Sequence, residues 1–265
     1  MRLGLLGAGG INGLVAGAVL DGRVPGVEVV AVAGSGAGSA SAARLAERLG
    51  AAAVAPQALA ASGCSWVLEA AGGGAVRAHV PSLWAAGVST IVMSIGAMID
   101  PLVEAAWRAA VGRGVRVVLP SGGIAGLDGV RAIAATGGLR RVSITTTKAP
   151  AGIRGAPYLT QHGIELPDDR AVTVFEGSAR EAVVGFPANV NVAIALSLAG
   201  LGPDATRVVV GSDPAARRTR HHIEAEGDVA SIEVRIESNP SPENPRTSFL
   251  ASASAVAALR EVAVT

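Results

Sequence analysis

The chain has 265 residues, of which 50% are hydrophobic and 16% are charged, so it holds enough apolar material for one large core or two modest ones. Its 22 basic residues nearly balance its 21 acidic residues, and no basic run or mixture of aromatic residues with arginine indicates nucleic-acid binding. The sequence contains no run of about 18 consecutive apolar residues without a charge or a proline, which argues against a membrane span. We therefore expect a small-molecule partner.

The start of the chain and its single cysteine bear on the cellular location and on disulfide or metal sites. Residues 1–7 resemble a strand and not the basic and apolar regions of a signal peptide, so the expected location is the cytoplasm. Cys64 is the only cysteine, which excludes an internal disulfide and a metal site with several thiolates. His, Asp and Glu residues show no metal-ligand spacing either, so no metal is expected.

Short strand-like runs alternate with Ala-rich helical stretches through the first 120 residues. The strand-like runs are residues 3–6, 27–33, 66–69, 90–93 and 115–119. This alternation is typical of α/β proteins, in which a parallel sheet is covered by helices on both faces. Because such crossovers are nearly always right-handed, we predict a doubly wound Rossmann domain.

The pattern changes after residue 120. Strand-like runs follow at residues 141–148, 171–175, 206–211 and 230–237, with fewer helices between them. They predict a second, α+β domain over residues 121–245. Apolar residues at helical spacing over 247–262 predict a final helix that packs back on the first domain. The dinucleotide-binding domain is then expected to comprise residues 1–120 with 246–265.

The first strand-like run leads directly into a glycine-rich turn, LGLLGAGGING over residues 3–13. In a strand–turn–helix setting, such glycines permit the tight turn and let backbone N–H groups approach a pyrophosphate. The third glycine of the usual pattern is displaced, because Asn12 stands at its position. An ordinary glycine turn without a ligand is the alternative. The candidate cofactor residues are Gly7, Gly9, Gly10, Ile11 and Asn12.

The acidic residue that binds the adenosine ribose in many NAD-binding domains is absent. It is expected about 20 residues on, at the end of the second strand, where this chain has Gly34, Ser35 and Gly36. Without a carboxylate there, Ser35, Ser39 or Arg44 is able to bind a 2′-phosphate. The sequence leaves NAD and NADP equally supported.

Further motifs follow one another along the whole chain. They are EAA at 69–71, SIGA at 94–97, SGGIAGLD at 121–128, VFEGSA at 174–179, FPANVNVA at 186–193, Asp213-Pro214, TRHHI at 219–223 and NPRTS at 244–248. In this order they resemble the L-aspartate dehydrogenase family.

The resemblance implies that a homodimer oxidises L-aspartate to iminosuccinate with NAD or NADP, and that iminosuccinate yields oxaloacetate and ammonia or enters NAD biosynthesis. It also implies that residues 121–245 form the substrate and dimerisation domain. It places the catalytic histidine at His221, where Thr219 replaces the usual Asn and the adjacent His222 remains an alternative. It assigns Gly123, usually Ala in the family, and Asn189 to the cofactor. We add Ala71 to the predicted cofactor residues.

The residue chemistry fits this implication. A histidine titrates near neutral pH, so His221 is suited to take a proton from the substrate amine and return one to a carbinolamine. Lys148, at the end of a strand-like run beside Pro150, is the candidate for binding a substrate carboxylate; a surface lysine is the alternative. Two other hypotheses remain: a related oxidoreductase with a different amino-acid substrate, and a dinucleotide-binding redox sensor without turnover.

Overall fold

The computed structural model describes residues 1–34, 36, 38–187, 190–242 and 247–264. The chain divides into two compact units. Unit 1 combines Met1–Pro120 with Ser252–Thr265, and unit 2 is Ser121–Ala251. Among the described residues, no helix is both long and apolar enough to cross a membrane.

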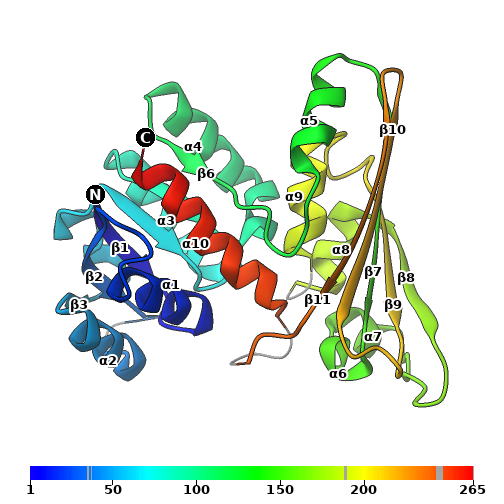
Figure 1. Ribbon diagram of the computed structural model, residues 1–265, viewed down its shortest axis with the longest axis horizontal. Helices are drawn as coiled ribbons and strands as arrows, with labels where there is room; N and C mark the ends of the chain where they lie inside the picture. Colours follow the sequence, from blue (N-terminus) through cyan, green and yellow to red (C-terminus); the bar gives the residue numbers. More distant parts are fainter. Residues whose placement is uncertain (35, 37, 188–189, 243–246, 265) are drawn as a thin grey trace. The chain divides into compact units, whose positions relative to one another are not determined.

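Unit 1 contains a six-stranded sheet in which every strand pair is parallel. The strand order is β3-β2-β1-β4-β5-β6, which is the doubly wound order of a Rossmann domain, and the predicted fold of this half is confirmed (Figure 1). The strands are β1 (Arg2–Leu6), β2 (Glu28–Ala33), β3 (Ala52–Val54), β4 (Trp66–Glu69), β5 (Ser89–Val92) and β6 (Val117–Val118). The helices are α1 (Gly10–Leu20), α2 (Ala40–Leu49), α3 (Gly73–Ala85) and α4 (Pro101–Gly112), with 3-10 turns at Pro56–Ala58, Ala60–Ser62 and Ile95–Ile99.

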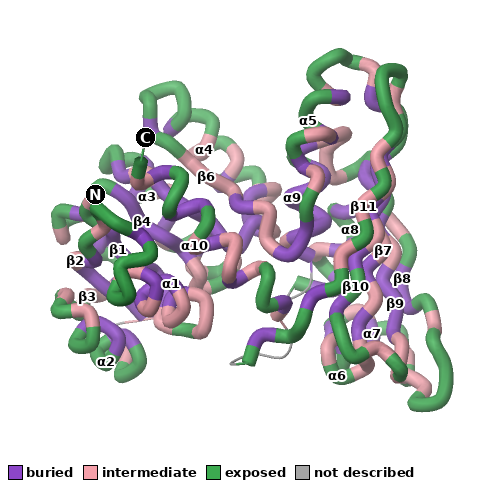
Figure 2. Tube along the Cα trace, viewed as in Figure 1, coloured by how far each residue is buried: buried purple, intermediate pink, exposed green. Residues whose placement is uncertain are grey.

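The core of unit 1 is closed by the end of the chain. Helix α10 (Phe249–Ala263) contributes Ala255, Ala258, Leu259 and Val262 to the buried cluster that also contains strand and α1 side chains. The central strands β1, β2 and β4 are buried, as the purple stretches in Figure 2 show. The prediction that the last helix packs back on the first domain is therefore confirmed.

Unit 2 is built on a mixed five-stranded sheet in the order β11-β10-β7-β9-β8. Only the β7–β9 pair is parallel, and helices α5, α8 and α9 lie on one face of the sheet (Figure 1). This confirms the predicted α+β character. The strands are β7 (Leu139–Lys148), β8 (Val172–Ser178), β9 (Arg207–Ser212), β10 (Thr219–Gly227) and β11 (Ser231–Ser238). The helices are α5 (Leu127–Ala135), α6 (Pro150–Ile153), α7 (Pro157–Gln161), α8 (Ala179–Gly185) and α9 (Asn191–Ala199).

Strand β10 is absent from the elements predicted from the sequence, although it lies near the centre of the second sheet. It pairs with β7 on one side and β11 on the other. Its sequence TRHHIEAEG alternates between buried and more exposed residues along most of its length, which is the period-two pattern of a strand with one covered face. The stretch around His221 is thus a core strand of the second sheet.

Candidate active site

The glycine turn between β1 and α1 has the form that an anion-binding site needs. Gly7 has a φ of +102°, and a Cβ placed on it would lie 2.7 Å from the carbonyl oxygen of Ala70. Gly9 precedes the first residue of α1, no side chain caps the helix there, and its first turn holds no acidic residue. A Cβ on Gly9 would meet no described atom within 4 Å. The N–H groups of Gly10 and Ile11 therefore begin a helix whose N-terminus is open, and these residues fit a pyrophosphate.

Asn12 braces this turn from inside. It is fully buried, and its Nδ2 donates to the carbonyl oxygens of Leu6 at 3.1 Å and Gly7 at 2.8 Å. The side chain thus ties the end of β1 to the first turn of α1, at the position where the usual pattern has a glycine. A backbone contact between Asn12 and a cofactor stays a prediction.

A buried carboxylate organises the neighbouring turn after β4. Glu69 Oε1 accepts from the backbone N–H groups of Ala71 at 2.7 Å and Gly72 at 3.0 Å. Glu69 Oε2 accepts from the backbone N–H of Ser94 at 3.0 Å, so one side chain links the ends of β4 and β5. Burial raises the pKa of Glu69 while these hydrogen bonds oppose the rise. The turn that contains Ala71 is therefore rigidly held beside Gly7.

The loop after β2 has no carboxylate, as the sequence indicated, and Ser35 lies outside the described residues. Ser39 Oγ accepts from the backbone N–H of Ala42 at 3.4 Å and caps α2. A Cβ on Gly34 would lie 2.2 Å from Ser39 Cβ, so only glycine fits at this end of the strand. The loop still leaves NAD and NADP open.

His221 lies in the interior of unit 2, on the covered face of β10. It is 4% exposed, and its cross-strand neighbour on β7 is Thr146. Thr146 Oγ1 and His221 Nδ1 are 2.9 Å apart and share a hydrogen bond. With Nδ1 engaged in this way, Nε2 is the ring nitrogen directed toward Gly123, where an added Cβ would lie 3.6 Å from it.

The surroundings of His221 keep its imidazole neutral. Burial disfavours the imidazolium, and the positive charge of Lys148 adds to this effect, so the pKa of His221 falls to about 3. At neutral pH the ring therefore carries one proton and offers one nitrogen lone pair. A neutral imidazole is the form that accepts a proton.

Lys148 is the only lysine in a chain whose other basic residues, apart from histidine, are all arginine. It is the last residue of β7 and is 7% exposed, so the surface alternative is wrong. Burial lowers its pKa to about 8. Because Thr146 and Lys148 are two residues apart on one strand, both point to the covered face where His221 lies.

His222 faces the opposite side of the sheet. Its Nε2 lies 2.9 Å from Glu233 Oε1 on β11, and its side chain is 36% exposed. The strand alternation thus separates the two adjacent histidines: His221 shares a face with Lys148, and His222 belongs to a charged outer surface.

Gly123 and Ser248 complete the surroundings of His221. A Cβ on Gly123 would lie 3.3 Å from Ser248 Oγ, so the missing side chain leaves room between the serine and the imidazole. Ser248 Oγ is itself 2.6 Å from Ser238 Oγ. Asn189, the other residue that the resemblance assigns to the cofactor, lies outside the described residues.

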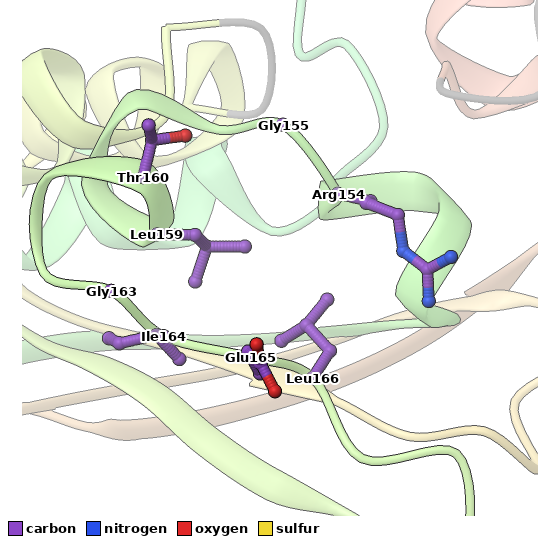
Figure 3. Close-up of a pocket in the computed structure, with 8 residues that line it drawn as sticks. All are labelled: Arg154, Gly155, Leu159, Thr160, Gly163, Ile164, Glu165 and Leu166. Atoms are coloured by element: carbon purple, nitrogen blue, oxygen red, sulfur yellow. The ribbon is translucent and has the colours of Figure 1, made fainter.

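A separate hollow in unit 2 does not include these side chains. It has a volume of about 460 Å³ and lies between the end of α6, α7 and the loop that follows. Figure 3 shows Leu159 and Leu166 pointing into it, with Arg154 at its side. Because neither His221 nor Lys148 lines it, we do not assign the chemistry to this hollow.

Comparisons with known proteins match the two units to two different families. Residues 7–120 match the family described as homoserine dehydrogenase, NAD binding domain, and residues 128–262 match aspartate dehydrogenase, C-terminal. An NAD(P)-binding Rossmann sheet followed by a unit with a buried histidine and lysine defines the class as an NAD(P)-dependent oxidoreductase.

The family follows from the relatives. L-aspartate dehydrogenase of Methanosarcina acetivorans is 43% identical over 202 residues, 76% of this chain and 74% of the relative. That of Methanocella arvoryzae is 37% identical over 264 residues, 98% and 96% of the two chains. The crystal structure of aspartate dehydrogenase from Thermotoga maritima shares the fold, with a TM-score of 0.72, 23% identity and coverage of 99% and 96%. The chain belongs to the L-aspartate dehydrogenase family.

Proposed function

We propose that the chain oxidises L-aspartate to iminosuccinate with NAD or NADP, with His221 as the acid/base and Lys148 as a ligand for a substrate carboxylate. The observation that carries this proposal is the pair of buried side chains on one sheet face: a neutral imidazole and the only lysine of the chain. In a family of aspartate dehydrogenases, such a pair suits a substrate with an ammonium group and two carboxylates.

The cofactor is held mainly by backbone in this proposal. Gly7, Gly9, Gly10 and Ile11 surround the open N-terminus of α1 and suit the pyrophosphate. When bound, NAD or NADP supplies the acceptor for the hydride that leaves the substrate Cα. The remaining predicted cofactor residues are Asn12, Ser35, Ala71, Gly123 and Asn189.

His221 handles the proton of the substrate nitrogen. The substrate ammonium must lose a proton before its nitrogen can form a double bond to Cα, and a neutral imidazole accepts it. Thr146 engages Nδ1, and in the tautomer in which Nδ1–H donates to Thr146 Oγ1, Nε2 is the atom that receives the proton. In the reverse direction the imidazolium returns this proton to the substrate nitrogen. The imidazolium also serves as the acid when a carbinolamine breaks down.

Lys148 supplies the positive charge for recognition. With a pKa of about 8, it is mostly protonated at neutral pH, and an ammonium group in a buried place pairs strongly with a carboxylate. Members of this family that act on a different amino acid would keep His221 and change the surroundings of Lys148. A redox sensor would keep the glycine turn without needing either side chain.

Two further proposals follow from the family and the chemistry. We propose a homodimer, in line with the resemblance. A substrate and cofactor of central metabolism agree with a cytoplasmic location. Sedimentation of the purified chain tests the first of these, and fractionation of the source cells tests the second.

The test of function is the absorbance of reduced nicotinamide in the presence of purified protein. We would assay L-aspartate and a panel of other L- and D-amino acids, each with NAD and with NADP. Reduction with L-aspartate is the expected result, and the ratio of rates decides the cofactor. Activity with another amino acid alone would favour a different substrate, and no activity throughout would favour the sensor.

The role of His221 is tested in the same assay. His221→Ala is expected to lower kcat by roughly two to four orders of magnitude while cofactor affinity changes little. His222→Ala is the matched control, since its side chain lies on the outer face. Equal losses in both variants would contradict the assignment.

A further inference from the structure

Besides Lys148, another buried polar side chain lies at the end of the second sheet, and the site described so far gives it no role. Ser212, the last residue of β9, is 1% exposed. Its Oγ is buried and has no hydrogen-bond partner in the described part of the chain. Buried hydroxyl groups nearly always have a partner, because leaving one unpaired costs free energy. An unpaired hydroxyl in such a place suggests a partner that arrives with a ligand.

The position of Ser212 in the sheet points to the substrate site. In the parallel β7–β9 ladder, Ser212 is the direct partner of Lys148. Directly paired residues on neighbouring strands present their side chains to the same face. The hydroxyl of Ser212 and the ammonium group of Lys148 therefore lie on the face that also carries His221.

We propose that Ser212 and Lys148 form a subsite for one carboxylate of a dicarboxylic amino acid. This inference rests on the proposed function and adds a residue that selects the substrate. The ammonium group of Lys148 pairs with the negative charge, and the hydroxyl of Ser212 donates a hydrogen bond to a carboxylate oxygen. A carboxylate has two oxygens with several acceptor positions, so it can accept from both groups at once.

The subsite also links recognition to proton transfer. The charge of Lys148 is the second cause of the low pKa of His221, after burial. A carboxylate bound to Lys148 offsets that charge, and the pKa of His221 then rises toward the range in which the imidazole exchanges protons efficiently. A substrate without this carboxylate would leave the histidine a weaker base. Lys148 and Ser212 thus favour dicarboxylic substrates both in binding and in turnover.

The single lysine makes a direct measurement possible. In protein labelled with isotopic lysine, the side-chain NMR spectrum contains one lysine, Lys148. Its signal is followed against pH with and without succinate, which has the two carboxylates of aspartate but no amine. We expect succinate to raise the pKa of Lys148, because the bound anion stabilises the ammonium form.

Ser212→Ala tests the hydroxyl itself. We expect the affinity for succinate to fall about tenfold and the KM for L-aspartate to rise about tenfold, which is the effect of losing one hydrogen bond to a charged group. The KM for NAD or NADP should stay unchanged. Ser212→Thr keeps the hydroxyl and should restore part of the affinity. The control is Ser143→Ala, a buried serine on β7 whose Oγ donates to Glu224 Oε2 at 3.3 Å. It should behave as wild type toward succinate.

The outcomes separate this inference from the proposed function. If wild-type protein oxidises L-aspartate but Ser212→Ala binds succinate equally well, the subsite is overturned and the function stands. If succinate fails to shift the signal of Lys148 in wild-type protein, the subsite is overturned as well. If succinate shifts the signal and Ser212→Ala weakens its binding, the subsite is supported even where L-aspartate is not oxidised.

Discussion

At the scale of single residues, the arrangement of His221 depends on one hydroxyl. Thr146 stands opposite His221 on the neighbouring strand and engages Nδ1 at 2.9 Å. This hydrogen bond restrains the imidazole, and in the proposed mechanism it leaves Nε2 as the nitrogen that faces the substrate. If His221 is the acid/base that we propose, Thr146 acts as a positioning residue and need not contact the substrate.

Replacing Thr146 tests this positioning role. Thr146→Val keeps the shape of the side chain but removes the hydroxyl, so the imidazole loses its fixed orientation. We expect kcat with L-aspartate to fall about tenfold or more, with the KM for the cofactor unchanged. Thr146→Ser should recover most of the rate in the same steady-state assay. An unchanged kcat in Thr146→Val would show that the hydrogen bond has no catalytic importance.

The burial of Lys148 makes a prediction about stability and pH. Its pKa is 10.5 in an exposed state and about 8 in the folded chain, so between these values the unfolded state binds more protons. The free energy of unfolding therefore rises with pH over this window, and the burial cost of the charged form is fully present below pH 8. The change amounts to about 3 kcal/mol.

Urea denaturation of wild-type protein and of Lys148→Met at neutral pH and near pH 10.5 measures this cost. Because Lys148 is the only lysine, no other lysine titrates in this window, and the pH-dependent part of the difference between the two proteins reports its titration. Lys148→Met should be the more stable protein at neutral pH, and the gap should shrink as pH rises. A gap that is independent of pH would contradict the lowered pKa of Lys148.

The sequence was informative about these residues to different degrees. The family motif points to His221, and the alternation of TRHHIEAEG separates it from His222 once the segment is treated as a strand. Ser212 carries no such signal, because a serine at a strand end is common and its lack of a partner depends on every atom around it. Its pairing with Lys148 is a matter of register between distant segments, which a single sequence does not reveal.

At the scale of elements, the glycine turn between β1 and α1 packs against the turn that follows β4. Gly7 adopts a φ that side chains disfavour and leaves no room for a Cβ beside Ala70. Glu69 holds the opposite side of this contact by accepting from the N–H groups of Ala71 and Gly72. The two turns are therefore closely packed, so a side chain added at Gly7 would press on the turn that Glu69 holds.

Gly7→Ala should consequently harm cofactor binding more than the chemistry. The substitution adds strain at a positive φ and a close contact with the carbonyl oxygen of Ala70. We expect the KM for NAD or NADP to rise about tenfold or more, together with a lower denaturation midpoint. Gly17→Ala is the control, because Gly17 lies within α1 and its new Cβ would be 3.5 Å from the nearest neighbouring atom, Arg48 Nη2. It should keep the KM and increase stability slightly. Similar KM values for the two variants would refute this account of the turn.

The elements that the sequence missed have plain physical reasons. Strand β3 has three residues, all alanine or valine, and such a short run does not differ from a helical segment in composition. Strand β10 was obscured by a run of arginines and two adjacent histidines. Asn12 was recognised as a departure from the glycine pattern, but its hydrogen bonds to Leu6 and Gly7 follow from the turn geometry alone.

At the scale of the whole molecule, the chain leaves the Rossmann sheet after Pro120 and returns to it at the C-terminal helix. The sequence predicted this return from the helical spacing of apolar residues. The sequence pattern could not locate the boundary between unit 2 and unit 1, because this boundary falls within α10 itself, between Ala251 and Ser252. Unit 1 therefore combines two segments that are separated in the sequence by the whole of unit 2.

Leu259→Ala measures how much unit 1 depends on that helix. Leu259 is fully buried in the cluster that contains Leu3 and Leu5 of β1, so its truncation leaves a cavity and is expected to cost about 2–5 kcal/mol. The denaturant midpoint should fall, and NAD or NADP should raise it again, because the cofactor binds only the folded sheet. Leu250→Ala, at a 39% exposed position of the same helix, should change the midpoint little. Equal midpoints for the two variants would contradict a stabilising role for Leu259 in the core of unit 1.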